Sequence, residues 1–262
     1  MKYKLAEDAK PQVTLLVVAT VLTVVLWFVP YAEYLVYPIR LFVTFIHESS
    51  HAIVALLTGG TVKSLTIASD GSGVVYSASS SLLGSIFTSS AGYLGTTLFG
   101  VAMLFMIRKN WSPHRILFGC GALIGVVTVI FTIVTPIFNF LSLDVGFSSV
   151  AFTIIAGAVI TAILMALAKF SSLRVANFAV GFLAVQCLLN ALSDLKTVLL
   201  INSPIGGSDI SNDATNMANA TGIPGFFWVI VWIGIAAAFI AVGLRMYANV
   251  KSVSGTESVF ND

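Results

Sequence analysis

The sequence predicts an all-α, polytopic membrane protein with about seven transmembrane helices and a short β-hairpin after the second of them. Hydrophobic residues make up 58% of the 262 residues and charged residues only 9%, whereas a soluble domain carries about a quarter charged residues. Apolar segments long enough to cross roughly 30 Å of hydrocarbon recur along the chain. We therefore expect the lipid bilayer to surround this protein, as an integral multi-pass protein of a membrane that the residues do not identify.

The expected spans are separated by polar or turn residues, with no stretch between them long enough for a soluble domain. They cover about 13–29, 37–57, 82–107, 116–140, 147–168, 175–201 and 224–246. Aromatic residues at 27–37 resemble an interfacial belt and no cleavage site precedes them, so we interpret the first segment as a retained span. Cys120 and Cys187 both lie inside apolar segments, where buried packing is expected and a disulfide is not.

A β-hairpin is expected directly after the second span. Gly59-Gly60 ends the helix, 61–67 is rich in β-branched residues, Asp70-Gly71 supplies a turn, and 73–76 resumes the extended pattern. A hairpin with a free edge can pair with an extended peptide, although a plain connecting hairpin fits the pattern equally well. The polar connection at 202–223 is expected to be either a lid or a solvated loop.

The motif that carries chemistry lies in the middle of the second span. His47 and His51 are four residues apart, so on a helix their imidazoles lie on one face and can share one metal ion. Glu48 between them is placed to act on metal-bound water, as in the HExxH motif of zinc peptidases. The alternative is a pair of core histidines. Because two of only three histidines fall in this motif, we favour a zinc site, with Zn²⁺ as cofactor.

A catalytic zinc takes three protein ligands and leaves one position open, so a third ligand must come from elsewhere. An acid at membrane depth is costly unless it is paired or bound to metal, which makes Asp194 in the sixth span the favoured candidate. If the second and sixth spans run in the same sense, Asp194 falls at a depth close to that of His47 and His51. The alternative for Asp194 is an ion pair or a position near solvent at a helix end.

Several stretches resemble one protein family. They are the HExxH segment with the following 52–60, the turn at 70–73, Ala91-Gly92-Tyr93-Leu94-Gly95, the stretch 189–194, Asn212-Asp213-Ala214 and the stretch 221–228. Together they resemble the site-2 protease family of intramembrane zinc metallopeptidases, in a compact branch without a PDZ domain.

The resemblance implies roles for four residues. His47 and His51 would be zinc ligands, Glu48 the general acid/base, and Asp194 the third ligand. The chain departs from the family because Leu195 follows Asp194 where the better-known members have Gly, and no proline precedes it nearby. Asp213 is therefore the alternative third ligand, or a residue with a gating role.

The function implied is that of a zinc metalloendopeptidase hydrolysing peptide bonds in or near transmembrane segments of membrane-protein substrates. Two alternatives remain: a non-proteolytic membrane scaffold or chaperone that retains the motif, and, less favoured, a metal or ion transporter. Nucleic acid is not an expected partner, because the excess of Lys and Arg over Asp and Glu is only two charges. We expect one domain, 1–262, with the metal-site core at about 37–202 and a flexible tail at 247–262.

Two further questions stay open at this stage. The positive-inside rule and the family resemblance place opposite faces of the protein in the cytoplasm. The small residues of the third span, from Ser85 to Gly95, could line a water path, but close helix packing is the favoured explanation.

Overall fold

The computed structural model describes residues 31–138, 146–202 and 211–249, together with positions 14, 17, 18, 20–23, 25 and 29. The expected first span at 13–29 therefore lies largely outside the described residues, as does nearly all of the expected tail at 247–262. Within the described part, six helices are long and apolar enough to cross a membrane, so the predicted all-α membrane fold is confirmed. The helices are α2 (Ala32–Leu57), α3 (Leu82–Arg108), α4 (Pro113–Val127), α5 (Thr135–Phe138), α6 (Phe147–Phe170), α7 (Leu173–Ile201), α8 (Asp213–Thr221) and α9 (Gly225–Asn249).

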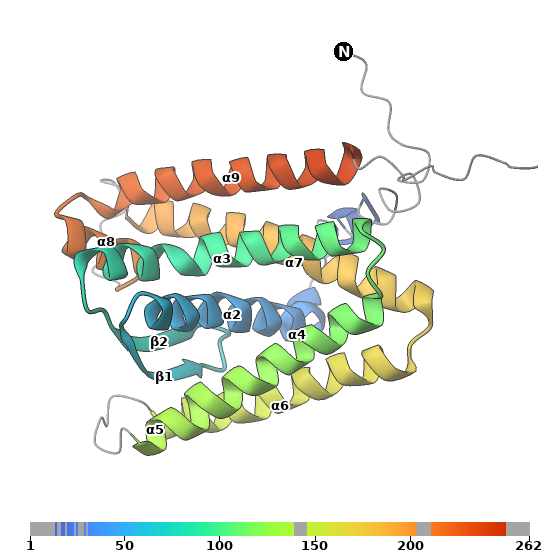
Figure 1. Ribbon diagram of the computed structural model, residues 1–262, viewed down its shortest axis with the longest axis horizontal. Helices are drawn as coiled ribbons and strands as arrows, with labels where there is room; N and C mark the ends of the chain where they lie inside the picture. Colours follow the sequence, from blue (N-terminus) through green and yellow to red (C-terminus); the bar gives the residue numbers. More distant parts are fainter. Residues whose placement is uncertain are drawn as a thin grey trace, which may run out of the picture.

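The long helices form a bundle in which α3 is central (Figure 1). It packs against α2, α7 and α9, while α4 and α6 pair with each other on the far side of α2. The outer faces stay apolar: Ile155, Val159 and Ile163 of α6 and Phe227 and Ile230 of α9 are all exposed. Surfaces of this kind are unusual on a soluble monomer and suit contact with lipid.

As far as the structure describes it, to Phe138, the predicted span at 116–140 is one continuous helical run made of three parts. Between α4 and α5 lies a π-helical segment, η2 (Thr128–Val134). Pro136 follows in α5; a proline cannot donate a backbone hydrogen bond and crowds the carbonyl four residues earlier, here that of Thr132. A widened turn accommodates such a defect without ending the helix.

The expected hairpin is present as β1 (Thr61–Ile67) and β2 (Gly73–Ala78), paired antiparallel with Leu65 opposite Val75 and Ile67 opposite Gly73. Its turn is tied to the first half of α2, because the Thr44 hydroxyl donates to the Gly71 carbonyl at 3.0 Å. Thr44 lies about 20 Å before the end of α2, at 1.5 Å per residue. The hairpin therefore folds back along α2, at the depth of the helix bundle.

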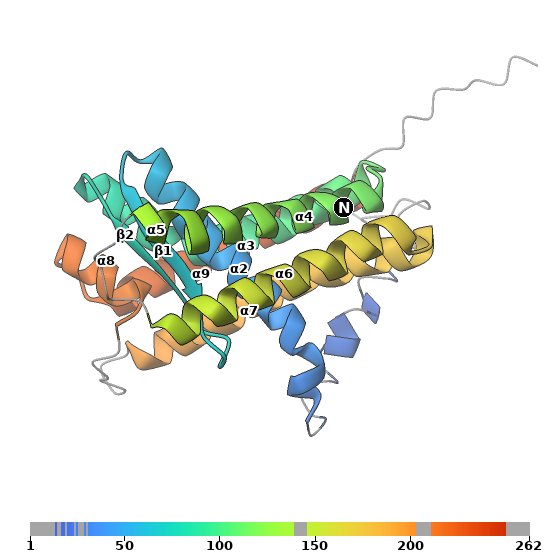
Figure 2. The same ribbon diagram turned by 90° about the horizontal axis from the view of Figure 1, so that it is seen from below.

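The two edges of this small sheet differ. β1 faces η2, α5 and α6 (Figure 2), and there threonine hydroxyls bond its outward backbone groups. Thr132 donates to the Leu65 carbonyl at 2.8 Å, and Thr153 accepts from the Ile67 N–H at 2.7 Å. A strand edge at membrane depth must be satisfied within the protein. β1 meets this requirement, while β2 turns its outer edge toward a cavity.

Replacing Thr153 with valine tests the closure of the β1 edge. Thr153 is fully buried, so T153V leaves the Ile67 N–H without its partner and is expected to cost about 1–3 kcal/mol. The measurement is the thermal unfolding midpoint in detergent. T161V is the matched control on the same helix, because the Thr161 hydroxyl makes only a long 3.4 Å contact with the Gly121 carbonyl. Equal midpoints for the two variants would contradict this role.

Candidate metal centre

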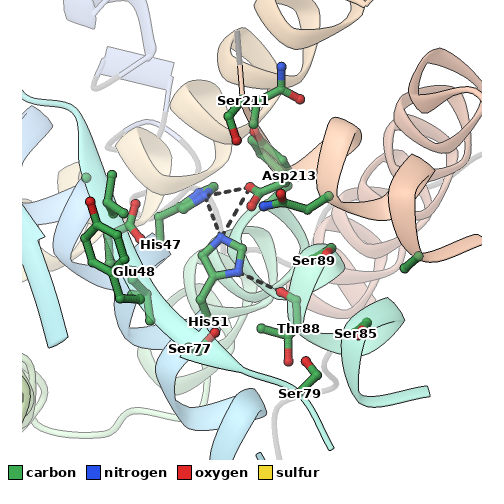
Figure 3. Close-up of a pocket in the computed structure, with 18 of the residues that line it drawn as sticks. His47, Glu48, His51, Ser77, Ser79, Ser85, Thr88, Ser89, Ser211 and Asp213 are labelled. Atoms are coloured by element: carbon green, nitrogen blue, oxygen red, sulfur yellow. Dashed lines mark hydrogen bonds and ion pairs between the residues drawn. The ribbon is translucent and has the colours of Figure 1, made fainter. Parts of the chain in front are cut away.

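A polar cavity of about 860 Å³ opens beside the HExxH segment. Its walls come from α2, β2, α3 and α8, and Figure 3 shows the side chains that converge on it. The lining includes His47, Glu48 and His51 of α2, residues 73–77 of β2, Ser85, Thr88 and Ser89 of α3, and Asp213 and Asn216 of α8. Hydroxyl, amide and carboxylate groups in such number make this cavity polar and large enough to admit water, inside a bundle that is otherwise apolar.

Three ligand atoms meet in this cavity. The Nε2 atoms of His47 and His51 are 3.1 Å apart, and Asp213 Oδ2 lies 3.4 Å from the first and 3.3 Å from the second. Zinc bonds to His and Asp are about 2.0–2.2 Å long, so ligand atoms at a tetrahedral centre are about 3.3 Å apart. The donor set and its spacing both fit zinc.

A hydrogen bond at the second ring nitrogen of His51 fixes the orientation of its imidazole. His51 Nδ1 lies 2.6 Å from the Thr88 carbonyl oxygen, and because a carbonyl only accepts, Nδ1 must carry the proton. Nε2 is then the free donor atom that points toward His47 and Asp213. A second hydrogen bond of this kind accompanies nearly every metal-binding histidine.

Helix α3 makes room for the site through its glycines. A Cβ on Gly92 would overlap the imidazoles of both His47 and His51, and one on Gly95 would overlap Ser50. The small residues of this helix thus serve both purposes raised by the sequence. Gly92 and Gly95 permit close packing on α2, whereas Ser85, Thr88 and Ser89 line the cavity.

Helix α8 places Asp213 opposite the histidines. Asn212 caps the helix with its side chain accepting from the N–H groups of Ala214 and Thr215, and Met217 on the next turn is fully buried. Burial by itself would raise the pKa of the Asp213 carboxyl, but the imidazoles of His51 and His47 hold it below its usual range. Part of the polar connection expected as a lid or loop is therefore a docked helix.

Asp194 lies elsewhere. Among the described residues the group of possible metal ligands consists of His47, His51 and Asp213, the alternative third ligand, and leaves out the favoured Asp194. Asp194 instead lines a second cavity with Arg40. Asp213 also falls outside the 37–202 range expected to hold the metal site. The depth argument from the sequence did not include Asp213, because it considered only acids within the predicted spans.

Glu48 stands between the two cavities and lines both. It is buried, with 6% of its surface exposed. The side chain fits there because residue 73 is a glycine: a Cβ at that position would overlap Glu48. A carboxylate beside the two imidazoles of the candidate metal centre and open to a polar cavity is placed to exchange protons with a water molecule there.

The third histidine and the two cysteines lie outside the site. His114 lies in the first turn of α4 and contacts the Ser171 carbonyl at 3.0 Å. Cys120 and Cys187 are buried free thiols, as expected.

The comparisons with known proteins give one result. The pattern that defines the Peptidase M50B-like family matches residues 16–243, which is most of the chain. No curated protein and no solved structure matches it. With the matched segment covering the HExxH helix, the hairpin, and helix α8 with Asp213, the chain belongs to the Peptidase M50B-like family, membrane metallopeptidases of the site-2 protease type.

Proposed function

We propose that this protein is a zinc-dependent endopeptidase that cleaves membrane proteins in or near their transmembrane segments. The observation that carries the proposal is the meeting of three ligand atoms at tetrahedral spacing beside Glu48, inside a cavity of the helix bundle. The spacing supports His47, His51 and Asp213 as the zinc ligands. Membership of a peptidase family supports the reaction class.

The residues divide the chemistry between them. Bound by these ligands, zinc would polarise the scissile carbonyl and lower the pKa of a coordinated water. Glu48 takes a proton from the attacking water and delivers it to the nitrogen of the leaving amine. His47, His51 and Asp213 hold the ion, while the Thr88 carbonyl keeps His51 in the required tautomer. The serine hydroxyls of α3 and β2 provide a hydrated route to the site.

The open edge of β2 supports a mode of substrate binding. Residues 65 and 67 of β1 direct their backbone groups outward to Thr132 and Thr153. In an antiparallel pair their partners Val75 and Gly73 must also direct theirs outward, on the opposite side. That side faces the cavity, so an unwound substrate segment can add to β2 as a third strand.

Metal content distinguishes the two candidate third ligands. We expect about one zinc per chain in detergent-purified protein, lost in H47A and D213A and retained in D194A, because only Asp213 meets the histidines. The metal is measured by mass spectrometry after gel filtration, which also shows whether each variant is folded. Zinc lost in D194A but kept in D213A would reverse the assignment.

The role of Glu48 is tested by E48Q, which keeps the shape of the side chain but removes the base. Turnover of a panel of labelled transmembrane peptides should fall by about a hundredfold or more, since general acid–base catalysis contributes about 10²–10⁴. Zinc content should stay at the parental value. A non-proteolytic scaffold would be indifferent to this change, so equal processing by E48Q and the parent would refute the mechanism.

Strand addition is tested by V75P. Proline removes the outward N–H of Val75 but, because that group does not pair with β1, leaves the hairpin ladder in place. We expect a higher KM for peptide substrates with zinc content unchanged. V75A keeps the N–H and is the control. Substrate binding that survives V75P at the level of V75A would show that this edge is not used.

A further inference from the structure

We propose that the second cavity, beyond Glu48, is a substrate subsite that accepts a side chain carrying hydrogen-bond donors, preferably Lys or Arg, with Asp194 as its specificity-determining residue. The inference rests on the proposed peptidase function and adds a substrate preference to it. It would also give Asp194 a role apart from the zinc site.

The position of this cavity places it on the substrate path. It has a volume of about 240 Å³ and lies between α2, α7 and the hairpin turn. It shares His47, Glu48, Gly73 and Tyr93 with the main cavity, so the two meet at the proposed base. Pockets for whole drug-sized ligands are about 300–1,000 Å³. A space of this size suits one long side chain.

The hairpin gives the direction of approach. Residues 73–77 of β2 line the main cavity, and residues 71–73 line the second one. A peptide paired along the outer edge of β2 would therefore run from the main cavity past Glu48 and toward the hairpin turn. Its side chains alternate between the two faces of the strand, so one near the scissile bond can enter the second cavity.

The polar side chains of α7 in this cavity are left as acceptors. Asn190 directs its amide nitrogen to the Gln186 carbonyl at 2.9 Å, which leaves its carbonyl oxygen. Thr197 donates its only hydroxyl proton to the Ser193 carbonyl at 3.0 Å. Asp194, with no hydrogen bond or ion pair to any residue that the structure describes, adds a carboxylate. Asp194 and Thr197 are exposed and Asn190 is half-buried, so these three acceptors are accessible to a donor that enters the cavity.

Arg40 does not supply a donor to these three acceptors. Its guanidinium lies along the hairpin turn, where a Cβ on Gly71 would be 3.2 Å from the Arg40 Nε. No ion pair joins it to Asp194 among the described residues. Arg40 is thus placed against the turn, and the carboxylate across the cavity remains open to a cationic side chain.

The experiment compares substrates with Lys, Gln, Leu or Glu at each position flanking the scissile bond. At one position the parent should favour Lys over Glu by about tenfold or more in kcat/KM, as charged hydrogen bonds are among the stronger ones. D194N should remove this preference and D194K should reverse it, with zinc retained in both. T197V, a milder change in the same cavity, should reduce the preference. An unchanged order of substrates in D194N, or an equal loss on all four, would overturn the proposal.

A readout independent of cleavage uses E48Q as the background. With a mild oxidant added, T197C should form a disulfide with a substrate cysteine at the selected position, whereas K196C, one residue earlier and outside the cavity lining, should not. The native Cys120 and Cys187 are buried and do not interfere. Cross-linking without cleavage by the parent would contradict the peptidase but not the subsite. Cleavage without cross-linking or substrate preference would overturn the subsite alone.

Discussion

The site depends on bringing a carboxylate to two imidazoles inside a bundle of apolar helices. His47 and His51 turn their Nε2 atoms to within 3.1 Å of each other. Two imidazole nitrogens this close to each other inside the bundle are stabilised by a third group that interacts with both. Asp213 supplies it from a helix 162 residues further along the chain than His51. That helix is held by a separate cluster in which Met217 and Trp232 are almost fully buried.

The same packing supports the histidines from behind. Tyr93 meets the edge of the His47 ring with centroids 4.7 Å apart, and Trp232 of α9 packs on Tyr93 at 5.5 Å. The Trp232 indole donates to Ser90 of α3 at 2.9 Å. Helices α2, α3 and α9 are therefore joined through one chain of aromatic contacts. These contacts hold the His47 ring beside His51 and Asp213.

The hairpin is the second element that the membrane constrains. Backbone groups at this depth must find partners within the protein, which explains why threonines of η2 and α6 close the β1 edge. The edge of β2 escapes the same demand only because it lines a polar cavity. The outward backbone groups of β2 therefore lie beside the candidate metal centre, where the proposed function would have them bind the backbone of a substrate peptide.

Much of this arrangement could be predicted from the residues. Span lengths, the Gly59-Gly60 stop, the Asp70-Gly71 turn and the HExxH spacing are local signals, and local geometry follows from them. The candidate third metal ligand is not local. Asp194 was favoured because an acid within a span is costly, whereas Asp213 sits in a polar stretch where an acid is ordinary.

Asp213 reaches the histidines only because 213–221 folds onto α3 and α9. That packing depends on tertiary contacts such as those of the buried Met217. Asn212 before Asp213, with Thr215 three residues later, is a capping pattern that could have suggested a helix there. The π-helical turn before Pro136 was likewise not foreseen, since proline only makes such a defect more probable.

The most direct test of the account is the absorption spectrum of the cobalt-substituted protein, with cysteine placed at each candidate third position. Cobalt(II) in a tetrahedral site gives intense visible bands, and a thiolate ligand adds a charge-transfer band in the near ultraviolet. We expect tetrahedral bands in the parent and the additional thiolate band in D213C but not in D194C. A thiolate band in D194C alone, or a weak six-coordinate spectrum in the parent, would contradict the metal centre described above.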